Sequence, residues 1–269
     1  MVGTGIQWAG QVTPAARGAI RGAEQVLFAV ADPWTVRWIR EQNPSCEPLP
    51  YPQDRTRRRR TYRDMEDRIL AYLEQGLRVC AVFYGHPGVL TTPAHGVIER
   101  ARSAGFSARL LPGVSALDCL FADLGVDPGR DGCQIYEATD FLIRPRRIET
   151  RTPSVFCQVG SIGRLDFYDP ADTEGIRKGL RTLSEVLCRD FEPEHEVTLF
   201  EAAVLPTEQP RITALPLEAL EEAAVTDLST LFVPAARRGA LDESMLRRLG
   251  MAVPAPAEND QPWFEVSPK

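Results

Sequence analysis

Short apolar runs recur along the chain, and each is followed by a loop of small residues and then by an amphipathic stretch. We predict a strand in each of six such runs: QVLFAVADP, LRVCAVFYGHPG, FSARLLPGVSA, PSVFCQVG, HEVTLFEAA and TDLSTLFVPA. Strands that alternate with helices are typical of α/β proteins with parallel sheets. The pattern therefore predicts an α/β fold.

Capping residues mark where helices begin. Thr13 before Pro14 predicts a helix with a threonine cap and a proline in its first turn, and Thr92 before Pro93 repeats the pattern. Ser115 and Asp118 resemble a capping box, with aspartate where glutamate or glutamine is usual.

The composition of the chain changes near IETRTP, residues 148–153. Glycine and proline motifs fill the loops before this point, and the later half has the pattern of a mixed, more antiparallel domain. We predict an N-terminal α/β domain over residues 1–148, a C-terminal α/β domain over 149–250, and a Pro-rich tail over 251–269 that is docked or loose.

Charge and composition exclude several classes of protein. The 31 Lys and Arg residues against 37 Asp and Glu residues give a formal charge of −6, which argues against a general nucleic-acid binder. The longest apolar runs are too short for a membrane span, and we predict a cytoplasmic protein. Six cysteines without a C-x-x-C pair and three histidines indicate reduced thiols, and neither a zinc site nor a disulfide framework.

Three glycine-containing loops could carry chemistry. VGTGI lacks the third glycine of a dinucleotide-binding loop, so a tight turn explains it equally well. YGHPG follows a buried strand, where α/β proteins bind ligands; its His86 has no acid or cysteine partner in sequence, which favours a loop-shaping role over a catalytic base. In LPGVSALD, Ser115 can cap a helix and contact a ligand, but the surroundings of a serine nucleophile are missing.

Five motifs occur in a characteristic order: VGTGI, ADP, YGHPG, LPGVSALDCLFADLG and YEATDFLIR. Together they resemble the tetrapyrrole-methylase superfamily of S-adenosylmethionine enzymes. DCLFADLG and CQIYEATDFLIR resemble in particular its borosin branch, which α-N-methylates backbone amides of a ribosomally made peptide. The resemblance runs from residue 2 to about residue 236 and implies a tetrapyrrole-methylase-like fold of two α/β domains with the cofactor in the cleft between them.

The resemblance also implies the cofactor site. S-adenosyl-L-methionine would bind there without a metal, with S-adenosyl-L-homocysteine as the product. The matching positions in this chain are Tyr84, His86, Val89, Ser115, Ala116, Gln158, Ala202, Ala203, Ser229 and Thr230. Loops of this kind offer the apolar walls and backbone hydrogen bonds that such a cofactor needs.

Arg58 and Tyr62 match the catalytic arginine and tyrosine of the family pattern R-x-x-x-Y-x-x-M, which Met65 completes. On a helix, residues four apart lie on one face. A peptide nitrogen is a poor nucleophile because its lone pair is delocalised into the carbonyl. We expect Tyr62, directly or through a water, to remove the amide proton, and Arg58 to stabilise the imidate oxygen; the neighbouring guanidinium charges should lower the pKa of the phenol. Tyr51 is expected as a second active-site phenol.

Six arginines lie within residues 55–63. Apart from Arg58, they form either a solvated face or a docking surface for an acidic leader peptide, and Arg63 is expected to pair with Asp67 at i,i+4.

The resemblance implies partners as well. Self-modifying members carry a C-terminal extension that ends in the substrate peptide, whereas this chain ends at Lys269. It therefore resembles the split type, which methylates a separate precursor peptide iteratively, as an interlocked homodimer with each active site built from both chains. Two alternatives stay open: a tetrapyrrole C-methyltransferase, whose many substrate carboxylates would suit the arginines, and a catalytically silent cofactor-binding scaffold for a peptide.

Overall fold

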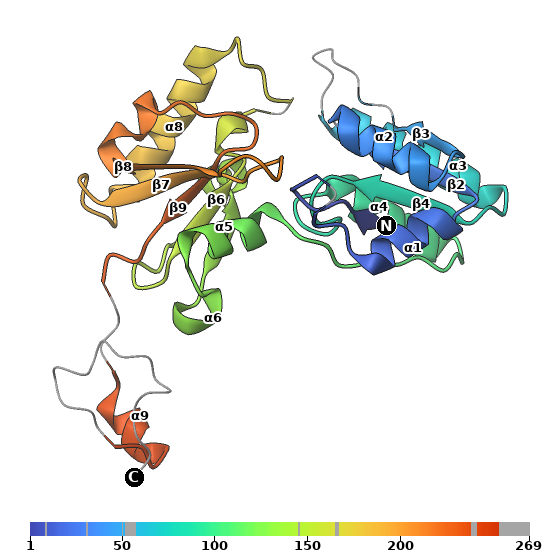
Figure 1. The fold of residues 1–269 in the computed structure, drawn as a ribbon. Coiled ribbons are helices and arrows are strands. Elements are labelled where there is room, and N and C mark those ends of the chain that lie inside the picture. The colour runs from blue at the N-terminus through green and yellow to red at the C-terminus, as the bar shows by residue number, and fades with distance from the viewer. Residues whose placement is uncertain are drawn as a thin grey trace.

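The computed structural model describes residues 1–8, 10–30, 32–49, 51, 58–144, 146–164, 167–237 and 241–252. Two sheets organise the chain, in an N-terminal and a C-terminal domain (Figure 1). The strands are β1 (Val2–Gly3), β2 (Gln25–Ala29), β3 (Cys46–Pro48), β4 (Val79–Phe83), β5 (Gln134–Glu137), β6 (Ser154–Cys157), β7 (Glu196–Glu201), β8 (Arg211–Pro216) and β9 (Thr230–Val233). The predicted α/β fold with two domains is confirmed.

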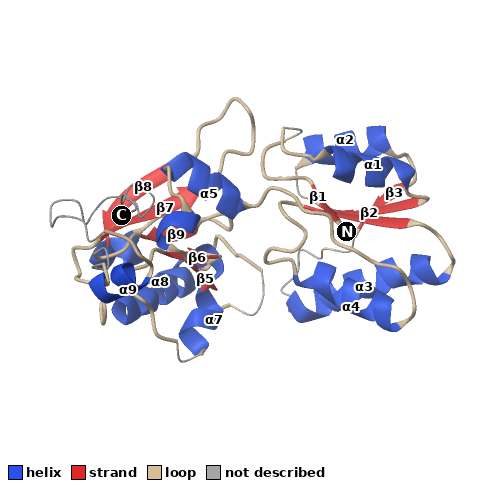
Figure 2. Ribbon diagram, turned by 90° about the horizontal axis from the view of Figure 1, so that it is seen from below, coloured by secondary structure: helices blue, strands red, loops and turns tan. Residues whose placement is uncertain are grey.

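The first sheet is parallel, has the order β1-β4-β2-β3, and lies between two layers of helices. Figure 2 shows α1 (Pro14–Gly22) and α2 (Pro33–Gln42) on one face and α3 (Arg58–Glu74) and α4 (Thr92–Ser103) on the other. Val82 on β4 packs toward the first pair of helices, and its neighbours Ala81 and Phe83 pack toward the second. Successive side chains of β4 point to opposite faces of the sheet, and helices cover both faces. Both faces of this strand are therefore apolar.

The second sheet has the order β5-β6-β9-β7-β8 and is mixed, as predicted: β5 runs parallel to β6, and the remaining pairs are antiparallel. Helix α8 (Thr173–Leu187) covers one face and α5 (Ala116–Leu124) covers the other (Figure 2). The remaining elements are α6 (Pro128–Asp131), α7 (Ala138–Ile143), α9 (Glu243–Arg248), η1 (Val159–Ser161) and η2 (Leu217–Glu222).

Five of the six predicted strands are present, and the one in FSARLLPGVSA is wrong. The backbone of residues 106–111 contacts the start of the chain instead: the Leu111 N–H donates to the Met1 carbonyl at 2.9 Å, and the Met1 ammonium donates to the Arg109 carbonyl at 2.8 Å. Because β1 has only two residues, this segment has too short a partner for a ladder. Strands β1, β3, β5 and β8 were not among the six predicted; β1 has only two residues, and β8 is exposed along most of its length.

Of the three helix-cap predictions, two are confirmed and one is wrong. Thr13 caps α1, accepting a hydrogen bond from the Ala16 N–H at 3.1 Å, and the Ser115–Asp118 capping box opens α5. The predicted Thr92 cap is wrong, because Thr92 is already helical and Thr91 precedes it without a capping bond. The Thr91 hydroxyl donates instead to carbonyls of the preceding loop.

The sheets divide the chain earlier than the predicted division between residues 148 and 149. Strand β5 already pairs with β6, and α5 packs on the same sheet. The composition change at residues 148–153 marks the connection from α7 to β6 rather than the passage between the sheets. Of the predicted tail, residues 253–269 lie outside the described part of the chain.

All six cysteines are free thiols, and Cys80 and Cys157 are buried. Within the described ranges, no group of three or more His, Cys, Asp or Glu side chains is placed to hold a metal ion. Among the helices described, none has both the length and the apolar character needed to cross a membrane.

Candidate active site between the two domains

A cavity of about 460 Å³ lies between the domains, at the carboxyl ends of β1 and β4. Its volume is within the range of small-molecule sites. The predicted site residues that line it are Tyr51, Arg58, Tyr62, Tyr84, His86, Val89, Ser115, Ala116, Gln158, Ala202, Ser229 and Thr230. The fold thus brings together side chains that are more than 170 residues apart in sequence.

Ala203 is the predicted site residue that does not line this cavity. It lines a neighbouring hollow of about 370 Å³ together with Gln7, Gln11 and Asp118, whereas Ala202 borders both spaces.

Two glycine loops form the floor of the site by bonding to each other. The Gly5 N–H donates to the Gly85 carbonyl at 3.2 Å, and the Gly85 N–H donates to the Gly5 carbonyl at 3.0 Å. A Cβ on Gly3 would lie 2.0 Å from the Gly85 carbonyl oxygen. The glycines of VGTGI therefore permit close backbone contact, which supports the tight-turn interpretation.

The His86 ring shapes its own loop. Its Nδ1 accepts a hydrogen bond from the Gly88 N–H at 2.9 Å, and its carbonyl accepts bonds from the Val89 N–H and the Thr91 hydroxyl. These bonds indicate that the imidazole helps to set the conformation of the loop.

Helix α3 carries Arg58 and Tyr62 into the cavity one turn apart. Thr61, Met65 and Ile69 form its buried face, so the adjacent face points toward the second domain. The Arg58 Nη1 donates to the Gln158 Oε1 at 3.3 Å across the domain junction. Among the described residues, the buried Nε of Arg58 has no hydrogen-bond partner.

Phe167 was not predicted as a site residue, and it contacts the three residues predicted to be catalytic. Its ring centroid is 4.6 Å from that of Tyr51 and 6.1 Å from that of Tyr62, and the Arg58 guanidinium lies 5.7 Å from it. No motif surrounds Phe167 in the sequence, and its contacts come from the other domain. No local signal could have identified it.

Asp227 was also missed. It is the one carboxylate among the described residues that line the cavity. Its negative charge opposes ionisation of Tyr51 and Tyr84. The sequence TDLST gives no indication that this aspartate faces a site.

The expected lowering of the Tyr62 pKa is wrong. Burial raises the pKa of the phenol above its ordinary value of 10, and the Arg58 charge offsets this only in part. Burial raises the pKa of Tyr84 as well. Tyr51 is 55% exposed as a whole residue, and the pKa of its phenol is raised to about 12, chiefly by desolvation.

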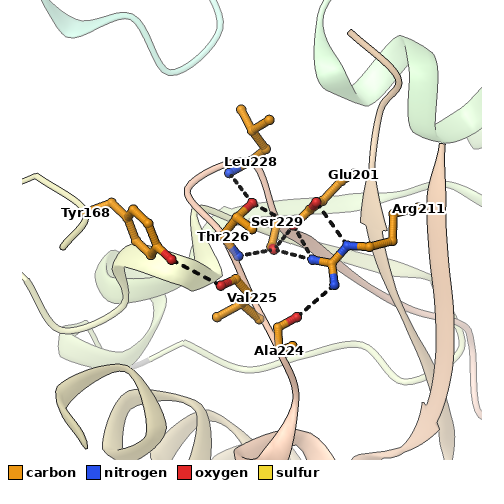
Figure 3. A network of polar contacts seen from close by, with 8 residues as sticks. All are labelled: Tyr168, Glu201, Arg211, Ala224, Val225, Thr226, Leu228 and Ser229. Atoms are coloured by element: carbon orange, nitrogen blue, oxygen red, sulfur yellow. Dashed lines mark hydrogen bonds and ion pairs between the residues drawn. The ribbon is translucent and has the colours of Figure 1, made fainter. Parts of the chain in front are cut away.

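The hydroxyl of Ser229 is engaged in a polar network within the second domain (Figure 3). It donates to the carboxylate of Glu201 and accepts from the Thr226 N–H at 2.8 Å. Glu201 also accepts bonds from Arg211 and from the Thr226 hydroxyl. Ser229 therefore holds the loop over residues 226–229 against the cavity, and its hydroxyl proton is not available to a ligand.

The arginine cluster is only partly described, because Arg55 and Arg57 lie outside the described residues. Arg59 and Arg60 are exposed on the first turn of α3.

The predicted pairing of Arg63 with Asp67 is wrong. Arg63 lies 3.3 Å from Glu66, and Asp67 pairs at 2.6 Å with Arg100 of α4. Glu66, which is nearly buried, pairs at 3.0 Å with Arg100 as well. The packing of α4 on α3 thus takes the acidic partner away from Arg63.

Residues 1–221 match the family model of tetrapyrrole (corrin/porphyrin) methylases, and the chain belongs to this family. It is 38% identical over 255 residues to a methyltransferase and ribosomally synthesized cyclic peptide dendrothelin A precursor of Dendrothele bispora, covering 93% of this chain and 60% of that protein. It is 36% identical to a methyltransferase and type I borosin cyclic peptide precursor of Coprinopsis marcescibilis, covering 98% of this chain and 69% of that protein.

Solved structures agree with the fold. The uroporphyrin-III-C-methyltransferase of Thermus thermophilus superposes with a TM-score of 0.63 at 19% identity, covering 87% of this chain and 93% of that chain. At this identity the likeness concerns the fold. The chain spans 60% of the length of the Dendrothele relative.

Proposed function

We propose that this protein transfers methyl groups from S-adenosylmethionine to backbone amides of a separate peptide precursor, iteratively. The observation that carries the proposal is the position of Arg58 and Tyr62, one helical turn apart, on the wall of a cavity that the YGHPG and PGVSA loops also line. The names of the relatives support a peptide substrate, because each joins a methyltransferase to a cyclic peptide precursor.

The residues of the cavity fit the cofactor. Ile6, Val89 and Leu117 offer apolar walls, and the glycine loops offer backbone groups at close approach. Arg58 is the only lysine or arginine side chain among the described lining residues, and Asp227 is negative, which suits a cationic sulfonium ligand. S-adenosylmethionine supplies an electrophilic methyl group when bound.

Arg58 and Tyr62 have complementary tasks in the proposed reaction. Loss of the amide proton places negative charge on the amide oxygen, which a guanidinium stabilises in a site of low dielectric. Tyr62, directly or through a water, takes the proton. Because its pKa is raised, the phenolate is scarce at neutral pH but strongly basic, and the rate should rise with pH until that pKa is reached.

The chemistry argues against a silent scaffold. A scaffold would need the cofactor loops and a peptide groove, but it would have no use for a guanidinium and a phenol beside the cofactor position. Arg58 is also held there at a cost, with a buried Nε that has no partner among the described residues.

The test is to incubate the purified protein with a candidate precursor peptide and S-adenosylmethionine carrying a deuterated methyl group. A mass increase of the peptide by whole deuterated methyl groups supports the proposal, and a series of increases supports iteration. A precursor that stays unchanged while the protein methylates a tetrapyrrole would overturn it. Tight cofactor binding without transfer to either substrate would instead support the scaffold.

The proposal includes a homodimer whose active sites draw on both chains, as the resemblance implies. Light scattering gives the mass of the particle in solution. Mixing two inactive variants, one changed at Tyr62 and one at the cofactor loop, should restore activity if the sites are shared between chains.

A further inference from the structure

Phe167 belongs to the second domain, and its aromatic ring contacts three side chains of the first. It packs against Tyr51 at 4.6 Å with the ring planes tilted by 39°, and against Tyr62 at 6.1 Å in an edge-to-face arrangement of 72°. The Arg58 guanidinium lies over the same ring at 5.7 Å. One side chain thus contacts all three residues predicted to be catalytic.

Two side chains near Phe167 in sequence, Tyr168 and Arg164, make polar contacts within the second domain. The Tyr168 hydroxyl donates to the Val225 carbonyl at 3.3 Å (Figure 3). The next residue, Thr226, is hydrogen-bonded to Glu201. Arg164 pairs with Asp172 at the start of α8. Phe167 thus lies between two residues, Arg164 and Tyr168, whose side chains are bonded within the second domain.

The Phe167 ring affects the orientation of Arg58, the orientation of the two phenols and the burial of Tyr62. An aromatic face attracts a guanidinium and limits its rotation. Edge-to-face and tilted ring pairs have preferred geometries, so the two phenols are oriented relative to one another. The ring also packs against Tyr62, and burial raises the pKa of that phenol.

We propose that Phe167 is a positioning residue, which holds Arg58 and the phenols of Tyr51 and Tyr62 in one arrangement across the domain junction and keeps water away from Tyr62. This inference rests on the proposed function, since it assigns a role within the same site. It adds a dependence of the catalytic helix on the second domain: the domains must be closed for Arg58 and Tyr62 to be correctly placed.

The first test needs no methylation activity. Protein labelled with ¹³C at the tyrosine ζ position is titrated by NMR, with the Tyr62 signal assigned from Tyr62→Phe. In Phe167→Ala, the pKa of Tyr62 should move down toward its ordinary value, because water reaches the phenol. The matched control is Tyr72→Leu, which removes an aromatic ring from a pair with Arg68 at 5.1 Å, on the same helix but away from the cavity. It should leave the Tyr62 titration unchanged.

The second test uses turnover. Phe167→Ala should lower kcat on the high-pH plateau by about tenfold, the order expected from the loss of ring and cation contacts, and should shift the rise of the pH–rate profile to lower pH. Phe167→Tyr keeps a ring and should restore most of the rate. Tyr168→Phe removes only the hydrogen bond to the Val225 carbonyl and should have an intermediate effect.

The outcomes separate the two proposals. If Phe167→Ala leaves both the Tyr62 titration and the pH–rate profile as in the wild type, the positioning role is refuted, whatever the enzyme does. If the titration moves as expected but the wild-type protein methylates no peptide, the positioning of Tyr62 stands and the proposed function fails. Equal loss of folding in Phe167→Ala and Phe167→Tyr, seen by thermal denaturation, would also count against a specific role.

Discussion

The substitution Gly160→Ala tests how the second domain shapes the site. Gly160 lies in η1 directly after β6, and a Cβ built on it would be 2.0 Å from the Thr226 carbonyl oxygen. Real Cβ atoms essentially never approach a backbone atom within 3.0 Å, so Gly160→Ala must move η1 and the loop over residues 226–229 apart by about 1 Å. That loop presents Asp227 to the cavity.

The loss of folding free energy follows from the hydrogen bonds that this movement weakens. The Ser229 N–H donates to the same Thr226 carbonyl at 3.2 Å, and the Thr226 N–H donates to the Ser229 hydroxyl at 2.8 Å. Two weakened hydrogen bonds cost about 1 kcal/mol each, and overpacking adds about 1–3 kcal/mol. We expect Gly160→Ala to lose about 3–5 kcal/mol of stability, which lowers Tm by roughly 12 °C for a chain of this size.

Thermal denaturation and cofactor titration together check this expectation. Gly160→Ala should show the lower Tm and also a weaker affinity for S-adenosylmethionine. Gly18→Ala is the matched control, because no atom lies within 4 Å of the added Cβ in α1 and the change should stabilise the helix by about 0.5–1 kcal/mol. A Gly160→Ala protein with wild-type Tm and cofactor affinity would refute the reasoning about the loop.

Three further changes have defined outcomes. Tyr62→Phe should abolish methylation while calorimetry finds an unchanged cofactor Kd; near-normal turnover would remove Tyr62 from the mechanism. Glu66→Gln should cost about 1–2 kcal/mol in urea denaturation, because Arg100 loses its buried partner; no change would mean that this pair does not hold α3. Burial alone would raise the pKa of Glu201, but hydrogen bonds led by that from Arg211 lower it below 4.5. A lowered pKa gives stability that is present above pH 4.5 and is lost as pH falls through the folded value. Glu201→Gln should therefore flatten the fall of Tm with acidification, and an equally steep fall would contradict this assignment.

Local rules predict what depends on neighbours in sequence. Thr13 and Ser115 cap the predicted helices, and the YGHPG loop lies at the end of its strand as expected. Features that depend on contacts across the domain junction were missed: Phe167 has no local pattern, and Asp227 is one aspartate among many.

Burial explains the main error about chemistry. From sequence, the arginines near Tyr62 suggest a lowered pKa, because charge is visible in the residue letters. Desolvation is not visible there, and it outweighs the guanidinium in the folded protein. The strand predicted in residues 106–111 failed for a related reason, since a ladder depends on the length of its partner and not only on its own apolar run.

The most direct test of the central claim is tandem mass spectrometry of a precursor peptide after reaction with this protein and S-adenosylmethionine. The account predicts fragment ions that place every added methyl group on a backbone nitrogen, and no methylation at a position whose amide is replaced by an ester. Methyl groups on side chains, or an equal mass increase when the amide is replaced, would contradict it.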